Sequence, residues 1–411
     1  NLVEFFLQDF FSIFITKFLV IKTMKNLFTF ALLLIFGICS SQIITGNIEN
    51  EAGNPVSNVN IYVDGSKIST VSASDGSFSI DIQNLKNGNL VFQKETFESY
   101  SIAINKALGK KVKVVLNKFK DIEEVVLIPY TEEAYRNYIQ YFLNEFIGSD
   151  QNNVKIKNQR TLKFSYDKKN KLLKVKAPKT LTISNKNLGY EIQYNLIAFE
   201  ADFNNNTISY AGTSFFKETS QKNTVKINRM DAYSGSMMHF LRSVYSKTTS
   251  QEGFIVNHVI KIPNKNYPTE EELEKLENFR RDFKTSNMMK IPEDIANITR
   301  RKNNEKPYTL ALIKSQIPES TYTKTLSGNV FLDFKDILQV NFKKYFYDLK
   351  KGQFVKTETS TNKSSYLYPE KDVFEIYADG NCSNPMELLA QGYLSEQKLE
   401  KLLPLDYQLG D

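Results

Sequence analysis

Few side chains in this sequence of 411 residues have types and spacings suited to catalysis. The chain contains two histidines, two cysteines and no tryptophan. His239 and His258 are followed three places later by Arg242 and Lys261. A zinc peptidase instead needs a His-x-x-Glu pair and a further histidine on the metal. The zinc carboxypeptidase motif is therefore absent, and we expect no catalytic metal.

The serines and cysteines do not form a familiar catalytic set either. Ser236 and His239 are close in sequence, but no acid that would orient the histidine accompanies them. Ser395 begins a Ser-x-x-Lys motif without its Lys-Thr-Gly companion and suits a helix cap better. Cys382 has no neighbouring histidine, so we expect a loop residue. With no glycine-rich phosphate loop, we expect no cofactor and no enzymatic activity.

One cluster remains a candidate ligand site, formed by Tyr233, Ser236, His239 and Arg242. Arg242 has the planar fork that holds a carboxylate or a phosphate, and a histidine such as His239 titrates near neutral pH. In the alternative interpretation, Arg242 ties its helix to neighbouring backbone carbonyls. The first interpretation leads to an enzyme with an unfamiliar site near His239 and Arg242, and the second to a structural role.

Composition and charge restrict the class of protein. Hydrophobic residues make up 41% of the chain and charged residues 24%, which is typical of a globular protein. Aromatic residues reach 13% through tyrosine and phenylalanine, which favours sheets over a helical bundle. The net charge of +7 is spread thinly, without basic runs interleaved with aromatics. We therefore expect no nucleic-acid partner.

The first 41 residues predict export. Met24 opens a short basic segment, an apolar stretch follows, and the small Ser41 precedes Gln42. This pattern is that of a secretory signal peptide over 24–41, cleaved between Ser41 and Gln42, with 1–23 lying upstream of the true start. Two alternatives are a membrane anchor over Phe10–Ile38, which three lysines interrupt, and a lipoprotein acylated at Cys39. We expect no stable transmembrane helix in the mature chain.

Alternating apolar and polar residues between Ile43 and Leu116 predict about seven short strands. Phe78, Ile80 and Ile82 are one example, because a period of two places one side of a strand in a core. Asp-Gly pairs at Asp64 and Asp75 suit tight turns. Calcium binding is the alternative for these aspartates and for Asp379. So many strands in so few residues predict a β-sandwich.

A known family carries the same pattern. The matching positions are Gly46, Gly53, Pro55, Val56, Val59, Ile61, Val63, Gly65, Thr70, Gly76 and Phe78. This stretch resembles the carboxypeptidase regulatory-like domain, a transthyretin-like β-sandwich of Gram-negative envelope proteins. Ala73 and Thr96 depart from the family's pattern. The resemblance implies the fold of residues 42–118 and brings no activity with it.

Residues 119–130 are predicted to form a linker strand, and 131–411 an α+β domain. Thr131 is expected to cap a helix that ends before Gly148. Strands are expected between Leu162 and Phe216, and a helix over Met237–Tyr245. The fold class is therefore mainly β, with a transthyretin-like β-sandwich followed by an α+β, sheet-rich second region.

Later elements are predicted from their caps and composition. Thr269 and Glu272 make a capping box for a helix. Residues 285–307 are polar and are expected to form a loop or to be weakly ordered. Two helices are expected near the C-terminus, one capped by Asn384 and one that begins at Ser395.

The second region also resembles part of a group of exported Gram-negative proteins of unassigned function. The similar segments are 146–148, 188–190, 233–243, 252–254, 392–393 and 403–407. Our leading hypothesis is a non-enzymatic protein of the periplasm or outer-membrane surface that binds a partner protein or a cell-wall component through its β-rich body. Residues 119–126 resemble the joint after the same sandwich in outer-membrane receptors, so an adaptor of such a receptor is a further hypothesis.

Overall fold

The computed structural model describes most of the chain after the proposed signal segment. The described residues are 42–83, 85, 87–119, 128–283, 291–343, 345–348, 351, 353–356, 363–369, 373–385 and 388–411. The predicted signal segment, including Cys39 and Ser41, lies outside them. So do residues 120–127 of the predicted linker.

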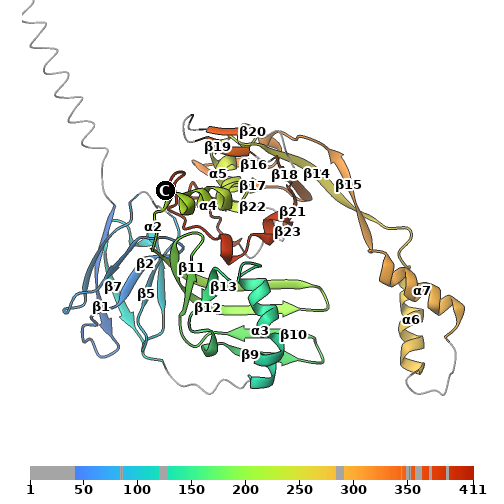
Figure 1. Cartoon of the computed structure of the whole chain (residues 1–411), viewed down its shortest axis with the longest axis horizontal. Helices are drawn as coiled ribbons and strands as arrows, with labels where there is room; N and C mark the ends of the chain where they lie inside the picture. Colours follow the sequence, from blue (N-terminus) through green and yellow to red (C-terminus); the bar gives the residue numbers. More distant parts are fainter. Residues whose placement is uncertain are drawn as a thin grey trace, which may run out of the picture. The chain divides into compact units, whose positions relative to one another are not determined.

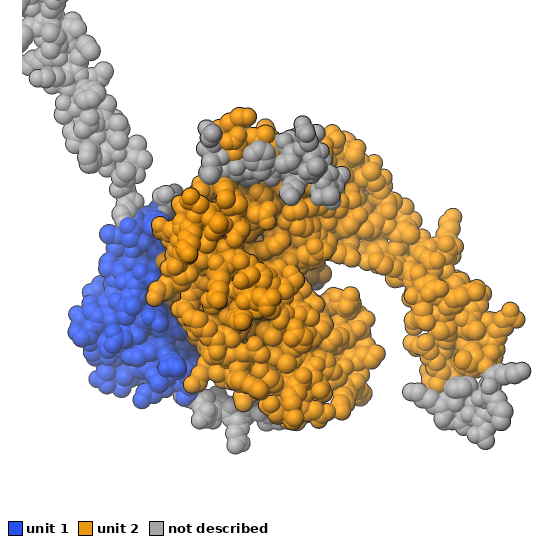
Figure 2. Space-filling model, in the orientation of Figure 1, with its two compact units in different colours: residues 1–61, 68–119 blue, residues 62–67, 120–411 orange. Residues whose placement is uncertain are grey.

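Contacts within the chain divide it into two units, drawn in different colours in Figure 2. Unit 1 comprises residues 1–61 and 68–119, and unit 2 comprises residues 62–67 and 120–411. The short segment 62–67 belongs to unit 2 because its backbone bonds there: Phe216 N–H donates to Ser66 O at 2.9 Å, and Leu405 N–H donates to Gly65 O at 2.7 Å.

Seven strands lie between residues 43 and 116, coloured blue to cyan in Figure 1. They are β1 (Ile43–Asn50), β2 (Asn60–Val63), β3 (Ser69–Val71), β4 (Ser77–Asp81), β5 (Asn89–Gln93), β6 (Tyr100–Ala103) and β7 (Lys111–Leu116). They form two sheets, in the orders β4-β1-β7 and β3-β2-β5-β6, with the short helix α2 (Ile104–Ala107) after β6. The predicted sheet-rich sandwich is confirmed.

The predicted alternation places the expected side chains in the core of the sandwich. Phe78, Ile80 and Ile82 are all buried, and Val112 and Val114 on β7 are buried in alternation with the exposed Lys111, Lys113 and Val115. Gly46 on β1 allows close packing, because a Cβ there would lie 2.1 Å from Val112 O and 2.6 Å from the Phe78 ring. A glycine is needed where two backbones approach this closely.

Unit 2 begins with a helix that packs on a six-stranded sheet. Helix α3 (Glu132–Phe146) starts as predicted, because the Thr131 side chain accepts a hydrogen bond from Ala134 N–H at 3.1 Å. The strands are β8 (Val154–Ile156), β9 (Lys163–Asp167), β10 (Leu172–Lys176), β11 (Leu181–Asn185), β12 (Tyr190–Asp202) and β13 (Thr207–Glu218). Phe142 and Phe146 of α3 are fully buried in the core that this sheet forms.

Two helices connect this sheet to a second one. They are α4 (Asn223–Tyr233) and α5 (Met237–Ser246), and the second matches the predicted helix over Met237–Tyr245. The second sheet has the order β15-β14-β18-β21-β23, formed by β15 (Tyr308–Lys314), β14 (Phe254–Pro263), β18 (Ile337–Phe342), β21 (Lys363–Pro369) and β23 (Leu388–Gly392) (Figure 1). A three-stranded sheet shares its core, with β16 (Thr323–Leu326), β17 (Asn329–Asp333) and β22 (Val373–Ile376), and a hairpin is formed by β19 (Tyr345–Asp348) and β20 (Gln353–Lys356).

A helical hairpin follows β14. The sequence predicts the start of its first helix correctly and its second helix wrongly. The capping box of α6 (Glu270–Phe283) is confirmed, because Thr269 N–H donates to the Glu272 carboxylate at 2.9 Å. The loop expected over 285–307 is instead helix α7 (Glu293–Asn304) in its described part. Ile295 and Ile298 bury against Leu276 of α6, so packing between the two helices outweighs the polar composition.

The prediction of two helices near the C-terminus is wrong for residues 388–392 and is met only by short 3-10 turns after them, while residues 386–387 lie outside the described residues. Residues 388–392 form strand β23, which pairs with β21, so a tertiary partner overrides the local helix signals there. Ser395 donates to Gly392 O within a single 3-10 turn, η4 (Tyr393–Glu396), rather than capping an α-helix. A second turn, η5 (Leu399–Lys401), follows, and Leu399 and Leu403 bury in the core of the six-stranded sheet.

Candidate functional site

The turn before α5 positions the residues of the predicted ligand cluster. Gly235 has a φ of +79°, and a Cβ at this position would lie 2.5 Å from the Phe342 ring. Glycine adopts this conformation without strain. Ser236 then caps α5 by accepting from His239 N–H at 3.1 Å. The Ser-x-x-His spacing is therefore explained by a helix cap.

His239 is fully buried and hydrogen-bonded through both ring nitrogens. Gly235 N–H donates to Nδ1 at 2.9 Å, so Nε2 carries the ring proton and donates to Glu252 Oε2 at 2.8 Å. The imidazole stacks on Tyr233 with ring centroids 4.7 Å apart. Its other ring neighbours are Phe254 and Phe342, at 4.8 and 5.5 Å.

The charge states of this pair follow from burial. Burial lowers the pKa of His239 below its ordinary value of 6.5, although the Glu252 carboxylate acts in the opposite direction. Burial also works against the charged form of Glu252, but hydrogen bonds from His239 and Thr248 outweigh it and hold the pKa of Glu252 below its ordinary value. The pair is therefore a neutral imidazole that donates to a carboxylate.

We expect His239 to make the stability of unit 2 depend on pH. Because its native pKa is lowered, the unfolded chain binds the proton first as pH falls. The stability contribution is complete above the ordinary pKa of 6.5 and is lost as pH falls from there through the native pKa. The difference in unfolding free energy between the wild type and His239→Gln should therefore shrink below about pH 6.5, by up to about 1.4 kcal/mol per pH unit.

Urea denaturation of both proteins at several pH values measures this difference. Glutamine keeps an N–H that can donate to Glu252, so the comparison isolates the titration of the imidazole. His258→Gln is the matched control, because His258 is the other histidine and its side chain is 33% exposed. A wild-type minus His239→Gln difference that stays constant from about pH 8 to about pH 5 would contradict the assignment.

Arg242 uses its guanidinium to hold three backbone carbonyls from two segments of the chain. Nε donates to Asp379 O at 3.0 Å, Nη1 to Tyr407 O at 2.9 Å and Nη2 to Leu405 O at 2.9 Å. The guanidinium also lies 5.5 Å from the centre of the Tyr233 ring. These are the contacts expected of an arginine that ties its helix to backbone carbonyls.

The structure therefore brings the four predicted residues together, with their polar groups directed at the protein. Tyr233 is 4% exposed, and burial raises its pKa to about 12. Cys382 is also buried, and burial raises the pKa of its thiol to about 11, so this cysteine remains protonated. The histidine's partner, Glu252, could have been found from the Glu252-Gly253-Phe254 motif, although the sequence does not assign it to His239.

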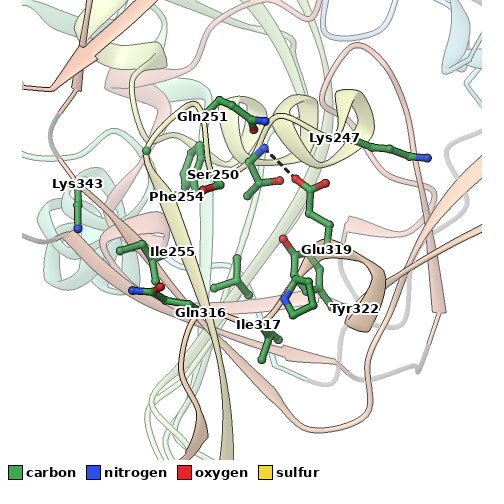
Figure 3. A pocket seen from close by; sticks show the side chains of 14 residues that line it. Lys247, Ser250, Gln251, Phe254, Ile255, Gln316, Ile317, Glu319, Tyr322 and Lys343 are labelled. Carbon is green, nitrogen blue, oxygen red and sulfur yellow. Dashed lines mark hydrogen bonds between the residues drawn. The ribbon is translucent and has the colours of Figure 1, made fainter.

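An open cavity is lined in part by Phe254, one of the ring neighbours of His239 (Figure 3). Its volume is about 480 Å³. Lys247 and Lys343 lie on opposite sides of it, while Glu319 accepts a hydrogen bond from Thr249 N–H at 2.9 Å. None of the fourteen described residues that line it is a histidine or a cysteine. Its polar lining residues include Thr249, Ser250 and Gln251.

Two further observations concern metals and membranes. Among the described residues, no three His, Cys, Asp or Glu side chains are grouped so that they could hold a metal ion. Every helix in the described ranges is too short or too polar to span a bilayer.

The two sheets of strands β1–β7 form a β-sandwich. Residues 44–127 match the family model of the CarboxypepD_reg-like domain, and the chain is a protein that contains this domain. No curated protein matches the chain.

Proposed function

We propose that this protein is a non-enzymatic component of the bacterial cell envelope that binds a partner protein or a cell-wall component through its β-rich second unit. The observation that carries the proposal is the use of His239 and Arg242 within the protein. Their ring and guanidinium nitrogens bond to Glu252 and to backbone groups. The side chains that the sequence singles out for chemistry thus support the fold.

The proposed location in the cell envelope rests on features of the sequence. The export pattern over 24–41 and the regulatory-like domain both favour an envelope protein of a Gram-negative bacterium. The hypothesis of an adaptor for an outer-membrane receptor rests on the segment after residue 118, most of which lies outside the described residues. The proposal therefore concerns binding by unit 2.

Fractionation and retention test the proposal together. We expect the full chain, expressed in a Gram-negative host, to be recovered from the envelope with Gln42 as its first residue by mass spectrometry. We also expect the immobilised chain to retain envelope material, in either a protein or a glycan fraction, above the level of the heat-denatured chain. Recovery of the untrimmed chain in the cytosol, or retention no greater than that of the denatured control, would refute the proposal.

A further inference from the structure

The five-stranded sheet of unit 2 has two chemically different faces. One face packs in the core through Val256, Val340 and Leu367. On the opposite face, strand register aligns one residue from each of four strands in a row: Asn257, Gln339, Tyr366 and Gln391. Asn257 at one end of the row is buried, whereas Gln391 at the other end is exposed. We call these four residues the amide row.

Hydrogen bonds give the amide row a direction. Asn257 Oδ1 accepts from Gln316 N–H at 2.9 Å, so its Nδ2 donates to Gln339 Oε1 at 2.8 Å. Gln339 Nε2 then donates to the Tyr366 hydroxyl at 3.1 Å. The phenol oxygen accepts this bond, which orients its own proton away from Gln339.

The exposed end of the row therefore presents donors. Gln391 Oε1 accepts from the Tyr368 hydroxyl at 2.8 Å, which leaves the Gln391 amide hydrogens directed elsewhere. Tyr366, Tyr368 and Gln391 all line a cavity of about 440 Å³. This volume is within the usual range of small-molecule sites.

The lining of this cavity includes a third phenol and further polar groups. Tyr308 of β15 lines it, together with Asn264, Asn304 and Glu305. Asn264 Nδ2 donates to Glu305 Oε2 at 3.0 Å, which orients this carboxylate. Lys261 Nζ lies 4.7 Å from the Tyr308 ring and 5.2 Å from the Tyr368 ring. The lining of the cavity thus includes aromatic rings, amides, one carboxylate and the ammonium group of Lys306.

The Tyr368 phenol of this cavity is uncharged at neutral pH. Burial raises the pKa of Tyr368, and the neighbouring phenols of Tyr308 and Tyr366 raise it further. Neutral hydroxyls and amides can each both donate and accept hydrogen bonds. Glu305 and Lys306 both line the cavity, so these two charges balance, and the amides disfavour a purely apolar ligand.

We infer that this cavity binds a pyranose oligosaccharide whose hydroxyls are mainly equatorial. Such a sugar has a flat C–H face suited to a tyrosine ring and a rim of hydroxyls suited to amides and a carboxylate. The inference rests on the proposed function and identifies the cell-wall component as a glycan. The shared chemistry covers peptidoglycan strands and other β-linked envelope polysaccharides.

Two soluble probes test the inference on the full chain: the β-1,4-linked tetramers chitotetraose and cellotetraose, titrated by calorimetry. We expect at least one tetramer to bind with a Kd below about 1 mM. Tyr366→Phe, which removes one hydroxyl, and Gln391→Ala should each weaken binding about tenfold or more, because each removes an outward donor. Gln251→Ala is the matched control, since Gln251 is an exposed glutamine at the other cavity.

The outcomes separate this inference from the proposed function. The glycan assignment would be overturned if neither tetramer binds. It would also be overturned if Gln251→Ala and Gln391→Ala weaken binding equally. If envelope protein is still retained in that case, only the assignment fails. If nothing is retained either, the proposed function fails with it. Melting temperatures of the variants show that each one is folded.

Discussion

Arg242→Ala is expected to destabilise unit 2 by about 3 kcal/mol without removing a catalytic group. The substitution leaves the carbonyls of Asp379, Leu405 and Tyr407 without their common donor. It also frees the C-terminal segment from α5, on which Arg242 lies. Urea denaturation that follows unit 2 by tyrosine fluorescence measures the change in unfolding free energy.

Two controls define this result. Arg242→Lys should recover only part of the loss, because one ammonium cannot reproduce the planar fork that reaches three carbonyls. Arg280→Ala, on the exposed surface of α6, should change the unfolding free energy by less than about 0.5 kcal/mol. Wild-type stability of Arg242→Ala would show that the contacts of Arg242 do not hold the fold.

Arg229→Met is expected to have a larger effect, about 3–5 kcal/mol. Arg229 is fully buried, and its Nη1 donates to Glu218 Oε1 at 2.6 Å. Its other nitrogens donate to Leu188 O at 2.8 Å and Ser220 O at 2.9 Å, and its guanidinium lies 4.2 Å from the centre of the Tyr190 ring. Removing the cation leaves the Glu218 carboxylate and the carbonyls of Leu188 and Ser220 without their donor.

A double variant separates the cost of the unpaired Glu218 charge from the cost of the packing lost with Arg229. Burial opposes the charged form of Glu218, but hydrogen bonds from Gln221 and Arg229 outweigh it and hold the pKa of Glu218 below its ordinary value. Arg229→Met combined with Glu218→Gln should therefore be more stable than Arg229→Met alone. The urea midpoint of both variants measures this recovery, and equal midpoints would contradict the ion-pair explanation.

Local patterns are sufficient to predict much of the fold. The alternation through Phe78, Ile80 and Ile82 identifies a strand because each strand of the sandwich buries one side. Thr131 and Thr269 locate two helix starts because a cap bonds only to its own first turn. The prediction for the C-terminal segment is wrong because β21 supplies backbone partners for residues 388–392 that no local signal shows.

At the candidate sites too, local patterns do not reveal partners that are distant in the sequence. Helical spacing correctly brings His239 and Arg242 together, but their partners come from other parts of the chain, such as Glu252 and Tyr407. Arg229 has no distinguishing signal in the sequence, since its buried environment depends on α4 and the sheet packing together. The amide row joins residues 257, 339, 366 and 391, which only the register of four strands makes neighbours.

The most direct test of the account compares two variants in one binding titration with the tetramer that the wild type binds. Binding is assigned to the amide row, and Arg242 is assigned a structural role. At a temperature where both are fully folded, Arg242→Lys should bind with wild-type affinity and Gln391→Ala about tenfold more weakly. Wild-type affinity in Gln391→Ala together with lost affinity in Arg242→Lys would contradict it.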